Sequence, residues 1–481
     1  MKYCDPNELY LCLDQGGHAS RALVFDQSGQ LVASAFRDIE ARHTTEGFIE
    51  YTADDLLATL NTAIRDALDL LGEKQRHIKL AGLATQRSNT ACWDHLTGQA
   101  LSPVISWQDR RGSEQIRQLS DQAPHIHAKT GLFLSPHYGA SKIRWCLDHV
   151  PAVADALQTG ELNYGPMASF LTRQLVREHP CVADLANATR TQLIDLRNLD
   201  WDEELLKLFE VPRAPLPRIV ANRHEYGHLQ TAPAVMLHQV TGDQSAALYA
   251  YGELQPDTAY INLGTGAFLS RPSGEVPRLG RRLLTSIIQH QAGRTEFVLE
   301  GTVNGAGAAL EWFAETNRLP DLFQQLPAWL LEVTRHDTLF LNGVSGLGSP
   351  FWVAEFASRF VGPADIRSRA VAVAESIIFL LQSNLDELLK LASPPEQIQL
   401  TGGLAHWDGL ARRLASLTGL PVYRPRECEA TGRGLAFLLA GRPSYWPEQE
   451  PGDWFEPEDD VALKRAYQAW QALMLEAMRL G

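Results

Sequence analysis

Cysteine is scarce in this sequence, which has only 6 in 481 residues, and no two of them form a CxxC pair. Scattered cysteines favour neither a disulfide framework nor a cysteine zinc site. They are typical of a reducing compartment, so we expect a cytoplasmic protein with buried thiols. The six are Cys4, Cys12, Cys92, Cys146, Cys181 and Cys428.

Excess basic charge is also absent. Lys and Arg together number 43, Asp and Glu number 57, and the formal charge is −14. A nucleic-acid partner requires a basic face, so none is expected. No apolar run is long enough to cross a bilayer, and Asp5 and Glu8 precede any apolar run, so we expect neither a membrane span nor a signal peptide. Phosphate ligands stay possible, because backbone dipoles can bind anions locally.

The common nucleotide and zinc motifs are missing or poorly formed. No GxxxxGK[ST] pattern occurs, and the glycine pairs at 305–307 and 432–434 lack the third glycine of a dinucleotide fingerprint. His224 to His228 matches HExxH, a pattern that binds zinc only on a stable helix. Gly227 lies inside it and prolines lie on both sides, so we predict a loop rather than a metal site.

What is present indicates two related α/β domains with a cleft between them. The length suits two or three domains. Strands at 9–14 and 21–26 flank a glycine turn, and strands at 259–263 and 267–271 flank another, so a similar unit opens each half. Helical spacing predicts helices at 53–71, 141–148, 170–177, 308–316, 366–391, 409–418 and 461–480. Residues 181–196 are expected to be irregular and polar.

One acidic residue near the middle of the chain can be interpreted in two ways. Asp243 follows Gly242 and precedes an apolar helical pattern at 246–250. It could simply cap that helix, as aspartates often do. Alternatively, the glycine lets a ligand approach the backbone, and the carboxylate contacts that ligand. The turn Gly264-Thr265-Gly266 is similarly open, because it could be an ordinary hairpin or an anion-binding turn.

The order of these segments resembles the FGGY family of carbohydrate kinases, and most closely its glycerol kinases. The resemblance covers nearly the whole chain. The matching segments are Asp14-Gln15-Gly16 with Ser20-Arg21, Thr85-Gln86-Arg87, Ser106-Trp107-Gln108, Lys142 with Trp145, 184–202, Gly242-Asp243-Gln244, Gly264-Thr265-Gly266, Glu300-Gly301, Gly402-Gly403 and Glu429-Ala430-Thr431.

The resemblance implies an α/β fold of two ribonuclease-H-like (actin-like ATPase) domains with an interdomain cleft. Residues 1–247 would form the N-terminal, substrate-binding domain and residues 248–481 the C-terminal, nucleotide-binding domain. The implied activity is transfer of the γ-phosphoryl group of ATP, with Mg²⁺, to a hydroxyl of a small polyol or sugar. Family members often form homodimers or homotetramers, so either state is possible here.

The resemblance also implies roles for individual residues. Asp243 would be the catalytic base, and Asp14 and Asp243 would lie at the metal. The implied substrate-binding residues are Arg87, Ser88, Trp107, His137, Asp243 and Gln244. The implied nucleotide-binding residues are Gly16, Gly17, Ser20, Arg21, Gly264, Thr265, Gly266, Gly307, Glu311, Gly402, Gly403 and Leu404.

Several positions depart from the glycerol kinase pattern. Ser88 replaces a glutamate and His137, beside Tyr138, replaces a tyrosine, so a roomier pocket for a four- or five-carbon polyol or a ketose such as a pentulose is an alternative to glycerol. Residues 17–19 read Gly-His-Ala where two threonines and a serine are usual, and Ala168 replaces a common aspartate. These losses favour a second alternative, a weakly active paralogue that binds nucleotide or sugar as a regulator.

Overall fold

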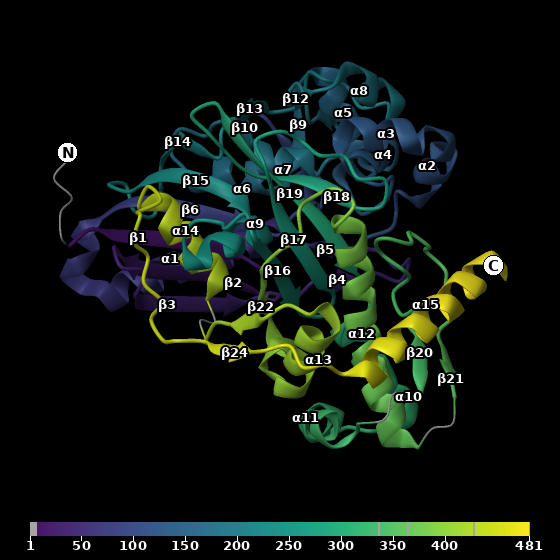
Figure 1. Cartoon of the computed structure of the whole chain (residues 1–481). Coiled ribbons are helices and arrows are strands. Elements are labelled where there is room, and N and C mark those ends of the chain that lie inside the picture. The colour runs from purple at the N-terminus through teal and green to yellow at the C-terminus, as the bar shows by residue number, and fades with distance from the viewer. Residues whose placement is uncertain (1–6, 335–336, 363–364, 427–428, 481) are drawn as a thin grey trace.

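The computed structural model describes residues 7–334, 337–362, 365–426 and 429–480. The first half of the chain builds a six-stranded sheet (Figure 1). Its strands are β1 (Leu9–Gln15), β2 (Ala19–Asp26), β3 (Leu31–Asp38), β6 (Ile78–Thr85), β14 (Arg223–His228) and β15 (Met236–Gly242). They lie in the order β14-β15-β6-β1-β2-β3, with β1, β2 and β3 antiparallel and β1, β6 and β15 parallel. We call the unit built on this sheet the first domain.

The second half repeats this arrangement in a seven-stranded sheet. Its strands are β16 (Thr258–Leu263), β17 (Ala267–Gly274), β18 (Leu284–Gln291), β19 (Arg294–Val303), β22 (Gln397–Thr401), β23 (Val422–Arg424) and β24 (Asp453–Phe455). The order is β18-β19-β17-β16-β22-β23-β24, with an antiparallel group around β16 and β17 followed by parallel β22 and β23. The expected repeat of two related α/β units is therefore confirmed. We call this unit the second domain.

Helices cover the sheets through their apolar faces. In α1 (Ala53–Leu71) the residues Leu56, Leu60 and Ile64 are buried, and the helix packs on β1, β2 and β3. The long α12 (Ile366–Leu388) packs on β17 and β19 and is buried along most of its length. The other helices of the second half are α10 (Gly307–Asn317), α11 (Leu322–Glu332), α13 (Asp408–Thr418), α14 (Ala430–Leu439) and α15 (Val461–Leu480).

One helix crosses between the domains. Although α14 lies late in the chain, it packs against β1 and β6 of the first domain and against α9 (Asp243–Leu248) (Figure 1). Leu435 and Phe437 of α14 share an apolar cluster with Tyr10 and Phe25 of the first sheet. The division at residue 247 stays a prediction, and α14 belongs spatially to the first domain.

A large insertion extends the first domain beside its main sheet. It contains a second sheet in the order β4-β5-β8-β7-β9. Its strands are β4 (Arg42–His43), β5 (Ile49–Tyr51), β7 (Thr90–Asp94), β8 (Val104–Ile105) and β9 (Leu162–Pro166). The accompanying helices are α2 (Ser113–Gln118), α3 (Ala123–Thr130), α4 (Gly139–His149), α5 (Pro151–Thr159), α6 (Met167–Leu175), α7 (Leu185–Thr189) and α8 (Glu203–Leu208). It also contains two short strand pairs, β10 (Val182–Asp184) with β13 (Arg218–Val220) and β11 (Ile194–Asp195) with β12 (Asp200–Trp201). A further short pair, β20 (Leu339–Leu341) with β21 (Arg359–Val361), lies in the second half of the chain.

Two local expectations from the sequence are wrong. The segment 181–196 contains β10, α7 and β11 and is almost wholly buried, because its polar side chains bond to one another inside the protein, as Asn187 does to Asp184 at 3.0 Å. The HExxH segment is not a loop but strand β14. Residues four apart in a strand lie roughly 13 Å apart, so His224 and His228 cannot share one zinc ion.

None of the helices in the described residues is both long enough and apolar enough to span a membrane.

Candidate functional site

Asp14 lies at the carboxyl end of β1 and is buried. The β1–β2 register places it opposite Arg21, whose Nη1 lies 3.7 Å from the Asp14 carboxylate and also 3.7 Å from that of Glu429. Burial and then the negative charge of Asp243 raise the pKa of Asp14 to about 7. The two acids, 229 residues apart in the chain, therefore lie within electrostatic reach of each other. The family resemblance implies that both acids lie at one metal, and this role stays a prediction.

Asp243 is the first residue of α9, where β15 ends. Its carboxylate does not cap the helix in the usual way, because Gly242 occupies the N-cap position and the Asp243 Oδ1 accepts from the neighbouring Gln244 N–H, at 2.7 Å. Burial raises the pKa of Asp243, and the positive charge of Arg87 opposes that rise. A Cβ at Gly242 would come 2.6 Å from the Arg87 side chain, so a glycine is required where these residues meet.

Arg87 is held by partners from both domains. Its Nη1 donates to Glu300 Oε1 at 2.9 Å, and its Nη2 donates to the side-chain oxygen of Gln244. Glu300, on β19, also accepts from Arg190 at 3.3 Å and from the hydroxyl of Ser286 on β18. Although burial alone would raise it, the pKa of Glu300 is lowered to about 2 by Arg87 and Arg190. The carboxylate is therefore charged, and it links the two domains through Arg87 and Arg190.

Glu300 and Arg190 had no role in the site expected from the sequence. Glu300 is one of two glutamates in β19, and its neighbours are mostly apolar, Phe297-Val298-Leu299 before it and Gly301 after it. Such an isolated acid in a buried strand needs a cationic partner, and this is the signal that could have identified it.

An aromatic wall lies beside Arg87. The rings of Trp107 and His137 are 5.3 Å apart, and the His137 ring lies 4.8 Å from that of Tyr138. Arg190 stacks over Tyr138 at 5.2 Å, so the wall is continuous with the Glu300 network. Burial and then the positive charge of Lys142 lower the pKa of His137 well below its usual value, which leaves the ring neutral at pH 7.

Ser88 occupies a position where few residues but glycine are unstrained. Its φ is 67°, and its buried hydroxyl finds no hydrogen-bond partner in the part of the chain that the structure describes. The buried Lys142 donates to the carbonyl of Ser88 at 3.2 Å and to that of His137 at 2.7 Å. Lys142 therefore ties together two of the predicted substrate-binding segments.

The predicted nucleotide turns are closely packed. The amide of Gly307, at the start of α10, donates to the carbonyl of Gly264 at 3.0 Å, and the amide of Ala308 donates to that of Thr265 at 3.0 Å. Thus the 264–266 turn rests on the N-terminus of α10. Gly402 has a φ of 95°, and a Cβ there would come 2.4 Å from the Leu263 carbonyl oxygen.

Other predicted nucleotide-binding residues differ in how their side chains are engaged. The hydroxyl of Ser20 points to the interior, where it bonds to Gln15 at 2.9 Å and to Thr59 at 2.8 Å. Glu311 is exposed on α10, and Leu404 is buried. Gly16 donates its amide to Ala19 across the β1–β2 turn at 3.0 Å, and a Cβ on Gly17 would come 2.6 Å from Gln86. The nucleotide contacts of these residues stay predictions.

A cavity of about 280 Å³ opens between the domains beside Arg21, which pairs with both Asp14 and Glu429. Three of the predicted nucleotide-binding residues line it: Arg21, Gly402 and Gly403. Residues that the sequence did not predict complete the wall, namely Ala247, Asn262, Leu400, Thr401, Ala405, His406, Arg424, Pro425, Glu429, Ala430 and Thr431.

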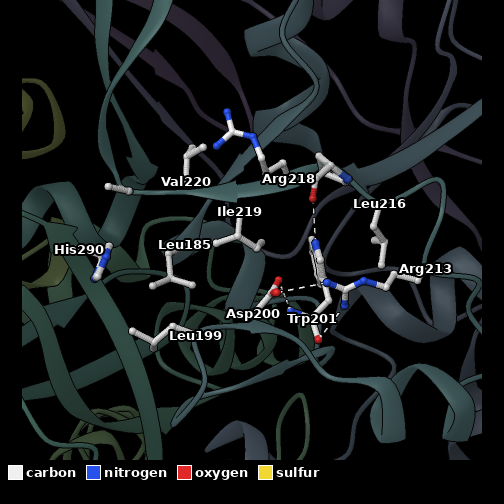
Figure 2. Close-up of a pocket in the computed structure, with 12 residues that line it drawn as sticks. Leu185, Leu199, Asp200, Trp201, Arg213, Leu216, Arg218, Ile219, Val220 and His290 are labelled. Atoms are coloured by element: carbon white, nitrogen blue, oxygen red, sulfur yellow. Dashed lines mark hydrogen bonds and ion pairs between the residues drawn. The ribbon is translucent and has the colours of Figure 1, made fainter. Parts of the chain in front are cut away.

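A larger cavity of about 530 Å³ lies elsewhere, against β13 and α7 (Figure 2). None of the residues predicted for the site lines it, and two of its charged residues, Arg213 and Asp200, pair with each other at 3.2 Å. We therefore place the chemistry in the cleft between the domains and not in the larger cavity.

Two family models match most of the chain. The model of the FGGY family of carbohydrate kinases, N-terminal domain, matches residues 9–246, and that of the C-terminal domain matches residues 259–441. Glycerol kinase 1 of Pseudomonas aeruginosa is 30% identical over 446 residues, which cover 91% of this chain and 90% of that protein. A glycerol kinase of Trichlorobacter lovleyi is 32% identical over 485 residues, which cover 98% of this chain and 95% of that protein.

Solved structures share the fold. The structure of Plasmodium falciparum glycerol kinase with ADP superimposes with a TM-score of 0.89 at 22% identity and covers 98% of both chains. A ligand-bound xylulose kinase from Lactobacillus acidophilus superimposes with a TM-score of 0.84 at 19% identity and covers 98% of both chains. The expectation of two ribonuclease-H-like domains is thereby confirmed.

Proposed function

Because the chain belongs to the FGGY family of carbohydrate kinases and is thus an ATP-dependent kinase of a small sugar or polyol, we propose that Asp243 is its catalytic base and that its acceptor is a polyol or ketose of four or five carbons. The observation that carries this proposal is the meeting of Asp14, Asp243 and Arg87 from three distant segments. Asp243 and Arg87 influence each other's pKa, and Asp243 raises that of Asp14.

The arrangement suits in-line transfer of a phosphoryl group. Trp107 offers an apolar surface for the carbon chain of the acceptor, and Arg87 and Gln244 offer polar atoms for its hydroxyls. The acceptor oxygen forms a bond to the γ-phosphorus of ATP, the bond from that phosphorus to the β–γ bridging oxygen breaks, and ADP leaves. Asp243 orients the attacking hydroxyl and takes its proton late in the transfer.

The donor set fits Mg²⁺. This ion prefers oxygen ligands and keeps several waters, so one or two carboxylates together with substrate phosphates suffice. Asp14 is a buried carboxyl and Asp243 a half-buried one; their like charges oppose each other, as the raised pKa of Asp14 shows, and a divalent cation would relieve that repulsion. When bound, Mg²⁺ would neutralise charge on the phosphate oxygens.

The choice of a longer acceptor rests on Ser88 and His137. Serine is two carbons shorter than the glutamate usual in glycerol kinases, so we expect a roomier pocket beside Arg87. Its buried hydroxyl has no hydrogen-bond partner among the described residues, so it can bond an additional acceptor hydroxyl. The neutral His137 ring can likewise donate or accept one hydrogen bond. A pocket built on hydroxyl bonding discriminates strongly, by roughly 10⁴-fold in favourable cases.

The decisive experiment measures ADP release with glycerol, erythritol, ribitol and several pentuloses. We expect kcat/KM for a four- or five-carbon acceptor to exceed that for glycerol by at least about tenfold. Preference for glycerol would refute the longer acceptor while leaving the kinase intact. Ser88→Glu provides the matched test, because it should lower kcat/KM for the longer acceptor and raise it for glycerol. Binding without turnover for every acceptor would instead favour a regulatory paralogue, which the missing hydroxyls at positions 17–19 make worth testing.

A further inference from the structure

Glu300 occupies an unusual position for a carboxylate outside the predicted site. It lies on β19 in the second domain and is only 3% exposed. Its two cationic partners, Arg87 and Arg190, both come from the first domain. Its remaining partner, Ser286, lies on the adjacent strand β18. A single side chain of one domain therefore holds two charged side chains of the other.

The contacts leave Arg87 little freedom. One of its terminal nitrogens is bound to Glu300 at 2.9 Å and the other to Gln244, the residue that follows Asp243. The guanidinium is planar, so fixing both terminal nitrogens fixes the plane of the whole group. Arg190 is held through one terminal nitrogen, because its Nη1 donates both to Glu300 at 3.3 Å and to the hydroxyl of Ser286 at 2.9 Å.

We propose that Glu300 is a positioning residue for the transfer reaction. It orients Arg87 toward the acceptor only when the two domains are closed on each other. Glu300 does this from the second domain, so opening the cleft separates it from Arg87. Acceptor binding and domain closure are then coupled through one carboxylate. The proposal rests on the proposed function, because it assumes that Arg87 contacts the acceptor.

A purely structural role would have a different signature. Buried ion pairs often contribute little net stability, because the cost of desolvating the charges offsets their attraction. A residue kept only for packing would change the Tm when replaced, without changing the affinity for one substrate in particular. Glu375 offers a matched control, since it is 1% exposed and bonds to Arg413 at 2.9 Å entirely within the second domain.

The test compares Glu300→Gln with Glu375→Gln in steady-state kinetics of the full chain. Glutamine keeps the size of the side chain but loses the charge that holds both arginines. We expect Glu300→Gln to raise the acceptor KM about 10- to 100-fold and to leave the ATP KM within about twofold. Glu375→Gln should lower the Tm and leave both KM values unchanged. Glu300→Asp, which keeps the charge, should recover part of the acceptor affinity.

Equal acceptor KM values in Glu300→Gln and the wild type would overturn the inference, as would equal rises in the KM for both substrates. If Glu300→Gln does not fold, Ser286→Ala decides, because it removes the hydroxyl that donates to Glu300 and accepts from Arg190, and it should raise the acceptor KM roughly threefold. An unchanged KM in that variant overturns the inference too. A wild-type enzyme that turns over no acceptor refutes the proposed function itself, and the present inference then fails with it.

Discussion

Replacing Asp14 with asparagine should stabilise the metal-free protein while destroying its activity. The buried carboxyl has a pKa of about 7, against an ordinary value of 3.8, because burial and the charge of Asp243 disfavour its ionised form. In the unfolded chain it ionises near 3.8. As the pH rises from 3.8 to 7, folding therefore requires uptake of a proton, and stability falls. Above pH 7 the loss is complete and constant.

The size of the effect follows from these two values. They differ by about 3 pH units, and each unit corresponds to about 1.4 kcal/mol, so the ionised carboxylate costs about 4 kcal/mol at pH 8. Asparagine has nearly the same size and carries no charge. We expect Asp14→Asn to raise the Tm by roughly 5 °C or more at pH 8 in EDTA, and by less than half as much at pH 5.

Thermal unfolding followed by calorimetry provides the assay, with Asp38→Asn as the control. Asp38 is an exposed aspartate on β3, where substitution should change stability by less than about 0.5 kcal/mol. Adding Mg²⁺ with ADP should raise the Tm of the wild type more than that of Asp14→Asn. A variant equal to or less stable than the wild type at pH 8 without metal would refute the idea that Asp14 is held at an electrostatic cost.

Other consequences of the structure can be tested in the same way. Asp243→Asn should lower kcat by at least about 10³-fold and leave the affinity for ADP, measured by titration calorimetry, unchanged. A variant with the wild-type kcat would place the base elsewhere. Gly402→Ala, which forces a side chain against Leu263, should lower the free energy of unfolding in denaturant by at least about 2 kcal/mol. Gly403→Ala is the control and should change it very little, because a Cβ at Gly403 meets no atom within 4 Å. Leu435→Ala, at a fully buried position of α14, should cost about 2–5 kcal/mol, and a smaller loss would show that α14 can detach from the first domain. The pKa of Glu300 is about 2 against an ordinary 4.5, so its ion pairs stabilise the fold fully above pH 4.5 and lose that effect as the pH falls toward 2. The difference in free energy of unfolding between the wild type and Glu300→Gln should therefore shrink over that range in acid titrations.

Elements defined by local periodicity could be predicted well from the sequence. Helix α1 begins at Ala53 and ends at Leu71, the bounds that its apolar spacing indicates, because Gly72 ends the pattern at once. The glycine turns after β1 and β16 are equally local, since a tight turn needs its special residues wherever it occurs. The roles expected for Asp14, Asp243 and Arg87 came from the family resemblance, and the structure brings these residues together.

Elements that depend on distant partners could not be predicted. Strands β18 and β19 carry the polar residues Ser286, Gln289 and Glu300. Polar residues are usually exposed, but these bond to side chains of the first domain, as Gln289 does to Gln239 at 3.4 Å. The Arg87–Glu300 pair joins residues 213 positions apart, and no window of sequence contains both. The polar segment 181–196 was misjudged for the same reason, because side chains that satisfy one another inside the protein have the composition of a loop.

The crossing of α14 sets the order in which the protein can be completed during synthesis. Tyr10, Cys12, Leu23 and Phe25 are covered by residues 435–439, so one face of the first sheet stays bare on a nascent chain until almost its entire length has left the ribosome. At bacterial or eukaryotic elongation rates this wait from residue 247 lasts on the order of ten to forty seconds. A fragment ending at residue 247 should accordingly be recovered as aggregates, and adding a peptide that spans 430–439 should bring part of it back into solution.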